Sequence, residues 1–259
     1  MQINKFIPLT IVAGLILVGV AQAKEELIEK EFEVKDGGTL FLDSDSGAIE
    51  ISTHNKPIVE VEVFKKGKDA DDFTVSFEQS GNDVTIEGDK KSMGWGSYSL
   101  QIKFVVKVPS EYNLELETGG GSIEVQDLTG DIDANTSGGS IRIEDVKGDV
   151  DVKTSGGSIR VEDVAGNVEG RTSGGSIKVK FSEQISEDSV LSTSGGSIAA
   201  YLPPSIKLDI DASTSGGRVK SDFDVDGSVK KTKIKGEING GGPLLKLRTS
   251  GGSVSIKEH

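Results

Sequence analysis

Hydrophobic and polar residues alternate with a period of two along most of the chain, in pairs of short runs. Within residues 136–153, Ile141 and Ile143 alternate with charged neighbours, and Val150 and Val152 do the same after a short gap. Alternation of β-branched and polar residues predicts a strand with one buried face and one exposed face. Each such unit is therefore expected to hold two short strands.

A six-residue motif, Thr-Ser-Gly-Gly-Ser-Ile, recurs with variants through the second half of the chain. The copies begin at Thr118, Thr136, Thr154, Thr172, Thr193, Thr214 and Thr249. The first four starts are evenly spaced, the next two steps are slightly longer, and the last step is the longest. A period of roughly 20 residues is typical of stacked repeats. The sequence predicts an all-β fold, a β-solenoid with about 18–21 residues per rung.

The parity of the apolar positions predicts where each rung turns. Thr154 shares the parity of Val150 and Val152, whereas the next apolar residue, Ile159, follows five positions later. Because an odd separation changes the face of a straight strand, the chain must bend between them. We expect the two glycines in this gap to adopt positive φ. A second corner is expected at 145–149, where aspartate hydrogen-bonds the turning backbone.

Stacking is required because one unit buries too little to fold alone. About five inward apolar residues contribute roughly 1.5–3 kcal/mol each, whereas ordering the backbone costs about 1–2 kcal/mol for every residue. Rungs about 4.8 Å apart would align the motif threonines in one inward column and the isoleucines that follow them in another. A β-sandwich of hairpins with glycine-rich turns is the alternative fold.

Residues 24–117 are expected to contain a degenerate rung and an inserted sheet. Leu40, Leu42 and Ser44 share a parity, and Ile49 follows Ser44 after five positions, so the solenoid is expected to begin near residue 39. Antiparallel strands that would cap the N-terminal end of the stack are predicted at Val59–Phe64, Phe73–Phe77, Val84–Glu87 and Tyr98–Val108.

Two further segments interrupt the repeat pattern. The polar loop 89–98 holds the only tryptophan, and Trp95 with Tyr98 forms the candidate partner-binding site, because an aromatic residue flanked by glycines can anchor a partner. The alternative is that Trp95 folds back onto the sheet. The insertion 221–242 is expected to hold a hairpin or a weaker rung.

The first residues have the pattern of a secretory signal peptide. Lys5 precedes an apolar run over 7–20, and Ala21-Gln22-Ala23 resembles a cleavage site. The run is short for a membrane span, although an uncleaved anchor is the alternative. We expect a signal peptide at 1–23, an N-terminal β region at 24–117 and glycine-rich solenoid repeats at 118–259. The protein is expected to be exported, periplasmic or extracellular, with no integral membrane segment after cleavage.

Composition limits the kinds of partner that the protein can bind and the kinds of reaction that it can catalyse. The formal net charge of −13 argues against nucleic acid and against electrostatic adhesion to anionic lipid. With no cysteine and only two histidines, the chain has no thiolate metal site and no Ser/His/Asp order. We therefore expect no enzyme activity, no catalytic residue and no cofactor, with Ca²⁺ as the one ion to consider.

Two acidic columns are the exception to this picture. One repeat position holds Asp127, Asp145 and Asp163, and another holds Asp131, Asp149 and Asn167. Stacked like charges repel unless an ion such as Ca²⁺ bridges them, and a carbohydrate-active enzyme would use such carboxylates. Because both columns adjoin a turn, a structural role in capping the backbone is favoured. The outward pairs Arg142/Glu144 and Arg160/Glu162 are interpreted as exposed ion pairs.

The mature chain resembles the DUF4097 family of bacterial β-strand repeat proteins. The resemblance rests on the Thr-Ser-Gly-Gly-Ser-Ile series, on second strands of the type Gly148-Asp149-Val150, and on Val108-Pro109 leading into 113–118. Phe32-Glu33-Val34 and Gly47-Ala48-Ile49-Glu50-Ile51 also match the family's opening strands. The resemblance implies an exported β-solenoid, often labelled a proposed adhesin, and supplies no catalytic motif.

Three functions are consistent with these patterns. The first is an adhesin-like interaction or scaffold module of the cell envelope that contacts protein or glycan through its walls or inserted loops. The second is a carbohydrate-active solenoid enzyme that uses acidic residues. The third is a structural envelope-stress protein without a discrete site. We favour the first, a non-catalytic exported module.

Overall fold

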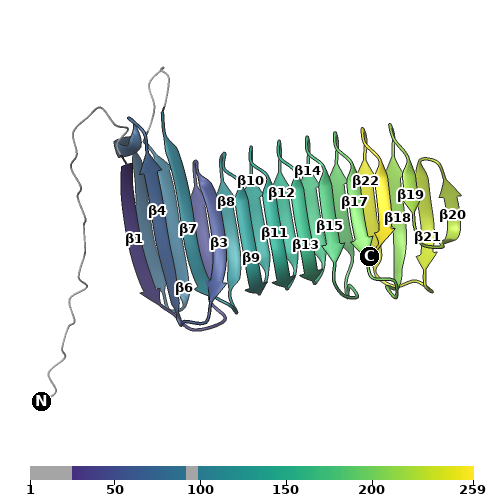
Figure 1. Cartoon of the computed structure of the whole chain (residues 1–259), viewed down its shortest axis with the longest axis horizontal. Coiled ribbons are helices and arrows are strands. Elements are labelled where there is room, and N and C mark those ends of the chain that lie inside the picture. Colours follow the sequence, from purple (N-terminus) through teal and green to yellow (C-terminus); the bar gives the residue numbers. More distant parts are fainter. Residues whose placement is uncertain (1–24, 92–98) are drawn as a thin grey trace, which may run out of the picture.

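The computed structural model describes residues 25–91 and 99–259 as an elongated β-solenoid in which two sheets enclose one continuous core (Figure 1). Each rung contributes one strand to each sheet. Sheet A has eleven strands in the spatial order β1 (Glu25–Glu33), β4 (Ile58–Lys66), β7 (Gln101–Pro109), β3 (Ala48–His54), β9 (Ile123–Thr129), β11 (Ile141–Lys147), β13 (Ile159–Ala165), β15 (Ile177–Phe181), β17 (Ile198–Leu202), β23 (Val254–Glu258) and β19 (Val219–Ser221).

Sheet B lies opposite sheet A and completes the rungs. Its twelve strands follow the order β20 (Asp226–Lys230), β21 (Lys233–Ile238), β18 (Leu208–Thr214), β22 (Leu244–Thr249), β16 (Ser189–Thr193), β14 (Val168–Thr172), β12 (Val150–Thr154), β10 (Ile132–Thr136), β8 (Asn113–Thr118), β2 (Thr39–Ser44), β6 (Asp83–Lys90) and β5 (Phe73–Ser80). A single 3₁₀ turn, η1 (Ala70–Asp72), is the one helical element in the described ranges. No helix there is both long and apolar enough to cross a membrane.

Neighbouring rungs of the repeat region run parallel and in register. Thr136 pairs with Thr118 on one side and with Thr154 on the other, and Ile141 pairs with Ile159. The seven motif threonines are all buried, with exposed fractions of 1% to 8%. The predicted inward columns and the β-solenoid are confirmed. A sandwich of hairpins is wrong for the repeats, because each strand pairs with the equivalent strand of another rung.

The first corner, the Ser-Gly-Gly-Ser segment after each threonine, turns by close backbone packing. Gly138 and Gly139 are not among the described residues with positive φ, so the predicted conformation of these glycines is wrong. A Cβ atom on Gly139 would lie 2.0 Å from the carbonyl oxygen of Gly121 in the preceding rung. The second glycine is therefore required because adjacent corners leave no room for a side chain.

The inward threonine completes the hydrogen bonding of this corner. Thr154 Oγ1 donates to the carbonyl oxygen of Gly139 at 2.8 Å and accepts from the N–H of Gly157 at 3.2 Å. The same two bonds recur at the other six motif threonines. A buried valine would fill the same space but leave both backbone groups without a partner, which explains the threonine.

The second corner, which joins sheet A back to sheet B, combines similar close packing with left-handed backbone, because a Cβ atom on Gly148 would lie 2.2 Å from the carbonyl oxygen of Gly130. Asp145 adopts a left-handed φ of 55°, and Gly148 follows with a φ of 149°. The side chain of Asp131 accepts from the N–H of Asp149 at 2.9 Å, and Asp149 in turn accepts from the N–H of Asn167 at 3.0 Å. The predicted turn role of these aspartates is confirmed.

The order of the rungs in space differs from their order in the chain at both ends. The last strand pair, β22 and β23, lies between β16–β17 and β18–β19 and pairs in parallel with all four strands. In the same way β2 and β3 lie between β6–β7 and β8–β9. This interleaving was not predicted from the sequence.

Antiparallel strands cover the N-terminal end of the stack. The pairs β4–β7, β5–β6 and β1–β4 are antiparallel, and their positions agree with the strands expected there, although β7 begins at Gln101. Phe32 on β1 and Phe77 on β5 approach with ring centroids 6.2 Å apart and partly cover the core at this end. At the other end, the insertion 221–242 forms the hairpin β20–β21. The proposed division into three parts stays a prediction.

Candidate interaction surface

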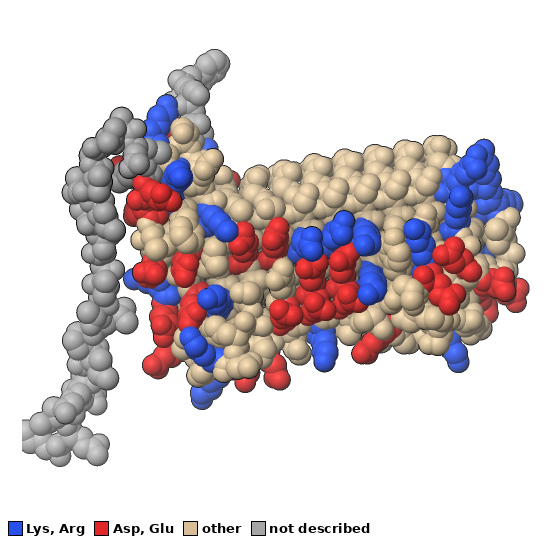
Figure 2. All heavy atoms as spheres, viewed as in Figure 1, with Lys and Arg blue, Asp and Glu red and all other residues tan. Residues whose placement is uncertain are grey.

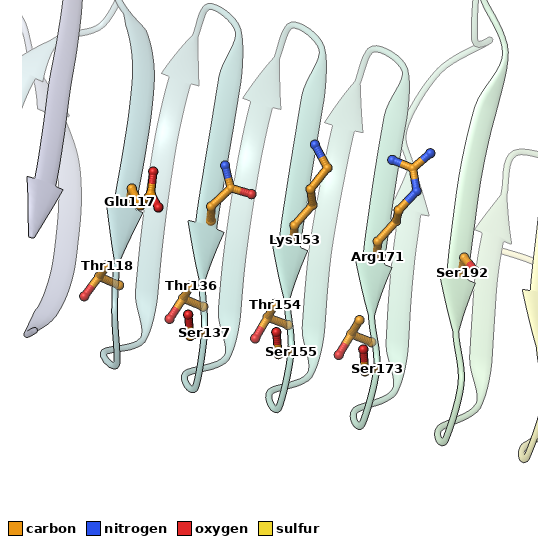
Figure 3. A pocket seen from close by; sticks show the side chains of 12 residues that line it. Glu117, Thr118, Thr136, Ser137, Lys153, Thr154, Ser155, Arg171, Ser173 and Ser192 are labelled. Carbon is orange, nitrogen blue, oxygen red and sulfur yellow. The ribbon is translucent and has the colours of Figure 1, made fainter. Parts of the chain in front are cut away.

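A shallow groove of about 360 Å³ follows the edge of sheet B along the first corners (Figure 3). The outward residues at its floor occupy one repeat position on successive strands: Glu117, Asn135, Lys153, Arg171 and Ser192. Four motif threonines, Thr118 to Thr172, and the first-corner serines Ser137, Ser155 and Ser173 line its side. Because the strands are parallel and in register, these side chains repeat at about 4.8 Å along the solenoid.

Ion pairs within single strands hold the cations of the groove. Lys153 Nζ lies 2.9 Å from Asp151 Oδ2, and Arg171 forms an ion pair with Glu169. Asn135 donates to Asp133 in the same arrangement, with the donor and acceptor 2.7 Å apart. Figure 3 shows Lys153 and Arg171 side by side on adjacent strands. Such half-exposed pairs contribute little to stability, so their regular placement is more relevant to recognition.

The groove continues into an acidic hollow of about 600 Å³ toward the N-terminal end of sheet B. The two share Glu117 and Asn135, and the hollow adds the carboxylates Asp43, Glu87, Glu115 and Asp133 beside Phe41 and Thr85. Along one column the outward residues change from Glu87, Asp43 and Glu117 through Asn135 to Lys153 and Arg171. This column therefore changes sign along the long axis, whereas the neighbouring outward column is acidic throughout: Glu115, Asp133, Asp151 and Glu169.

The exposed face of sheet A carries paired charges instead (Figure 2). Arg142 pairs with Glu144, and Glu162 lies 3.2 Å from Arg160 and 2.6 Å from Lys178. The hydrogen bond from Lys178 lowers the pKa of Glu162 below its usual value. The predicted exposed ion pairs are confirmed. Both exposed faces therefore carry ion pairs, and sheet B differs from sheet A by the groove along its first corners.

The acidic columns at the second corner have structural partners. Asp127, Asp145 and Asp163 share a left-handed φ of 55° to 60°, and Asp163 pairs with Lys180 at 2.6 Å. Among the residues that the structure describes, no group of three or more His, Cys, Asp or Glu side chains could hold a metal ion. Calcium binding stays an untested prediction. The two histidines lie apart, His54 hydrogen-bonded to the N–H of Lys56 and His259 to Phe181.

The predicted partner-binding residues, Trp95 and Tyr98, lie outside the described residues, so their role stays a prediction. The groove on sheet B was not identified from the sequence. Its signal is present, because Glu117, Asn135, Lys153 and Arg171 recur at equal intervals directly before the motif threonines. The predicted columns consist of the inward positions of the repeat, whereas the groove is formed by its outward positions.

Comparison with known proteins places the repeats in a known family. The family model Toastrack DUF4097 matches the chain twice, over residues 38–165 and 113–257. No curated protein matches the chain.

Several solved structures are similar in outline only. A proposed cell adhesion protein from Clostridium sporogenes is 16% identical, with a TM-score of 0.45 over 92% of this chain and 100% of its own. A proposed adhesin from Bacteroides fragilis is 15% identical, with a TM-score of 0.43 over 93% and 100% of the two chains. A proposed lipid binding protein from Parabacteroides distasonis is 16% identical, with a TM-score of 0.29 over 90% and 96%. Likeness at this level carries no functional argument.

Proposed function

The chain belongs to the Toastrack DUF4097 family, and from this premise we propose that it is an exported, non-catalytic interaction module of the cell envelope. The groove of sheet B is its binding surface for an extended protein or glycan segment. The signal-peptide pattern of residues 1–23, which lie outside the described residues, supports export.

This proposal rests on the parallel, in-register pairing of the strands that form the groove. Asn135, Lys153 and Arg171 belong to consecutive strands whose partners align residue by residue, so their polar groups form a straight row. An extended polymer that lies along the solenoid axis can contact several rungs at once. Many weak contacts of this kind sum to useful affinity without a deep pocket.

The chemistry of the groove indicates what such a segment carries. Serine hydroxyls, an amide and two cations on one side favour hydroxyl and carboxylate groups, whereas Glu117, Asp43 and Glu87 favour amines at the other end. An extended partner with acidic and basic groups at opposite ends fits this row better than a uniformly charged one.

The test is saturable binding of the purified, fluorescently labelled protein to isolated cell envelopes. We expect the double variant Lys153→Ala/Arg171→Ala to weaken binding at least tenfold, because both cations of the row are lost. The matched control Arg160→Ala/Lys178→Ala removes the same charge from sheet A and should bind like the wild type. Equal binding of both variants, or no saturable binding by the wild type, would contradict the proposal.

A further inference from the structure

Cations gather at the C-terminal end of the solenoid, where the hairpin β20–β21 turns (Figure 2). This basic tip consists of the exposed residues Arg218, Lys220, Lys230, Lys231 and Lys233. The N–H of Val219 donates to the carbonyl oxygen of Lys231 at 2.9 Å, and Lys230 pairs with Lys233, so the turn lies against the first corner of the outermost rung. None of the five cations forms an ion pair within the described part of the chain.

The tip is an exception in an acidic protein. Residues 203–259 hold ten Lys and Arg against seven Asp and Glu, a net charge of +3, whereas residues 24–202 hold 18 against 35, a net charge of −17. Unpaired like charges repel one another, so their concentration at one end has an electrostatic cost that an anionic ligand would relieve.

Carboxylates near the tip are fewer than its cations. Asp222 lies two residues after Lys220, whereas Asp226 and Glu237 pair at the open end of the hairpin, four residues along β20 from Lys230. Four residues of extended strand span about 13 Å, which exceeds the screening length of about 8 Å in physiological salt. The acidic walls lie further away, because eleven strands at about 4.8 Å make sheet A about 50 Å wide. The tip therefore acts as a separate basic surface.

An exposed apolar side chain accompanies these cations. Val229, with 63% of its surface exposed, is the most exposed large hydrophobic residue in the described ranges, and it lies at the same end of β20 as Lys230, on the opposite face of the hairpin. A segment that combines exposed cations with an exposed apolar residue is suited to the boundary between lipid headgroups and acyl chains. A soluble polyanion would leave Val229 in water.

We infer that the basic tip docks the protein end-on to an anionic phospholipid surface, with Val229 entering the headgroup layer. The docking is independent of the sheet B groove and leaves that groove accessible along the rod. It also revises the expectation that the net charge prevents adhesion to anionic lipid. The net charge is an average over a molecule several screening lengths long, whereas a surface interacts with the end that it touches.

The experiment measures binding of the exported protein to large unilamellar vesicles. The protein is isolated after export with its own leader, and vesicles contain either phosphatidylcholine alone or phosphatidylcholine mixed with the anionic lipid phosphatidylglycerol. We expect flotation only with the anionic vesicles, and its loss at high salt. Each cation near such a surface contributes roughly a fivefold change in partitioning, so Lys230→Gln/Lys231→Gln/Lys233→Gln should reduce partitioning on the order of 100-fold.

A control with the same charge change separates the tip from the net charge. The variant Lys35→Gln/Lys147→Gln/Lys207→Gln removes three exposed cations away from the tip and should partition like the wild type. Val229→Ser should reduce partitioning a few-fold and should do so at every salt concentration. Equal losses in the two triple variants or equal binding to neutral vesicles would each overturn the inference. Assembly of the protein into end-to-end chains without lipid would instead assign the tip to a second copy.

Discussion

The two corners of each rung share close backbone packing at a glycine but differ in backbone conformation and in their side-chain hydrogen bonds. At the first corner the backbones of successive rungs approach so closely that Gly139 has no space for a Cβ atom. At the second corner, side chains of Asp131 and Asp149 bridge successive rungs, and Asp145 adopts a left-handed φ. The glycines of either corner tolerate no side chain, whereas the hydrogen bonds of the second-corner aspartates can be lost at limited cost. Four predictions compare the cost of changing the side chains at and near these corners.

The largest effect is expected for a methyl group added at the first corner. Gly139→Ala places a Cβ atom 2.0 Å from the Gly121 carbonyl oxygen, so two rungs must separate, and we expect the free energy of unfolding to fall by about 3 kcal/mol or more. Gly138→Ala is the matched control, because its Cβ atom would lie 3.9 Å from the nearest atoms. Urea unfolding monitored by circular dichroism measures both. Similar stabilities of the two variants would show that corner packing does not require glycine.

The next effect concerns Tyr112, which lies at the second corner between β7 and β8. Its hydroxyl donates to the carbonyl oxygen of Asn82, and burial raises the pKa of Tyr112 from 10.0 to about 12. The unfolded chain releases this proton at lower pH than the folded chain. The stabilising contribution is therefore complete below pH 10 and is lost as the pH rises toward 12, by roughly 2–3 kcal/mol.

The Tyr112→Phe variant isolates this contribution. The difference in unfolding free energy between the two proteins should change between pH 10 and 12, because phenylalanine does not ionise. A constant difference across that range would show that ionisation of Tyr112 does not affect stability.

A smaller loss is expected from the inward threonines. Thr154→Val keeps the shape but leaves the carbonyl of Gly139 and the N–H of Gly157 without their partner, and should cost about 1–3 kcal/mol. Thr154→Ser, which keeps the hydroxyl, should be the more stable of the two if hydrogen bonding outweighs the lost methyl group. The reverse order in thermal unfolding would show that packing decides this position.

The smallest effect is expected at the second corner. Asp149→Ala removes the acceptor for the backbone N–H and the side-chain amide of Asn167, and should cost about 0.5–1.5 kcal/mol. Asp149→Asn retains a carbonyl acceptor and reduces the charge of the column, so it should be close to neutral. A loss of unfolding free energy above about 3 kcal/mol for the alanine variant would show that Asp149 matters as much as Gly139.

The inward half of the fold could be predicted because burial imposes a strict period of two. The parity of Val150, Val152 and Thr154 is enough to identify the threonine as buried and to locate the corner that follows it. The reason for the glycines could not be predicted in the same way. Positive φ and the lack of a Cβ atom are both properties of glycine, and only the position of the neighbouring rung shows which of them is needed.

Neither the spatial order of the rungs nor the groove was predicted from the sequence, for two other reasons. The repeats at Thr193, Thr214 and Thr249 present equivalent inward residues, so nothing local states which of them are neighbours. The groove depends on outward residues, which no packing constraint makes periodic. Glu117, Asn135 and Lys153 differ in type and charge, so their equal spacing before the motif threonines does not by itself indicate a shared binding role.

The interleaved rung β22–β23 has a mechanical consequence. In a stack that followed chain order, the outermost coil could peel away by breaking hydrogen bonds one after another on one flank. A pull on β23 instead loads the ladders to β17 and β19 together, while β22 is held by β16 and β18. Rupture then requires many hydrogen bonds to break at once. A tether attached to β23 would therefore resist tension far better than one attached to the terminal hairpin β20–β21.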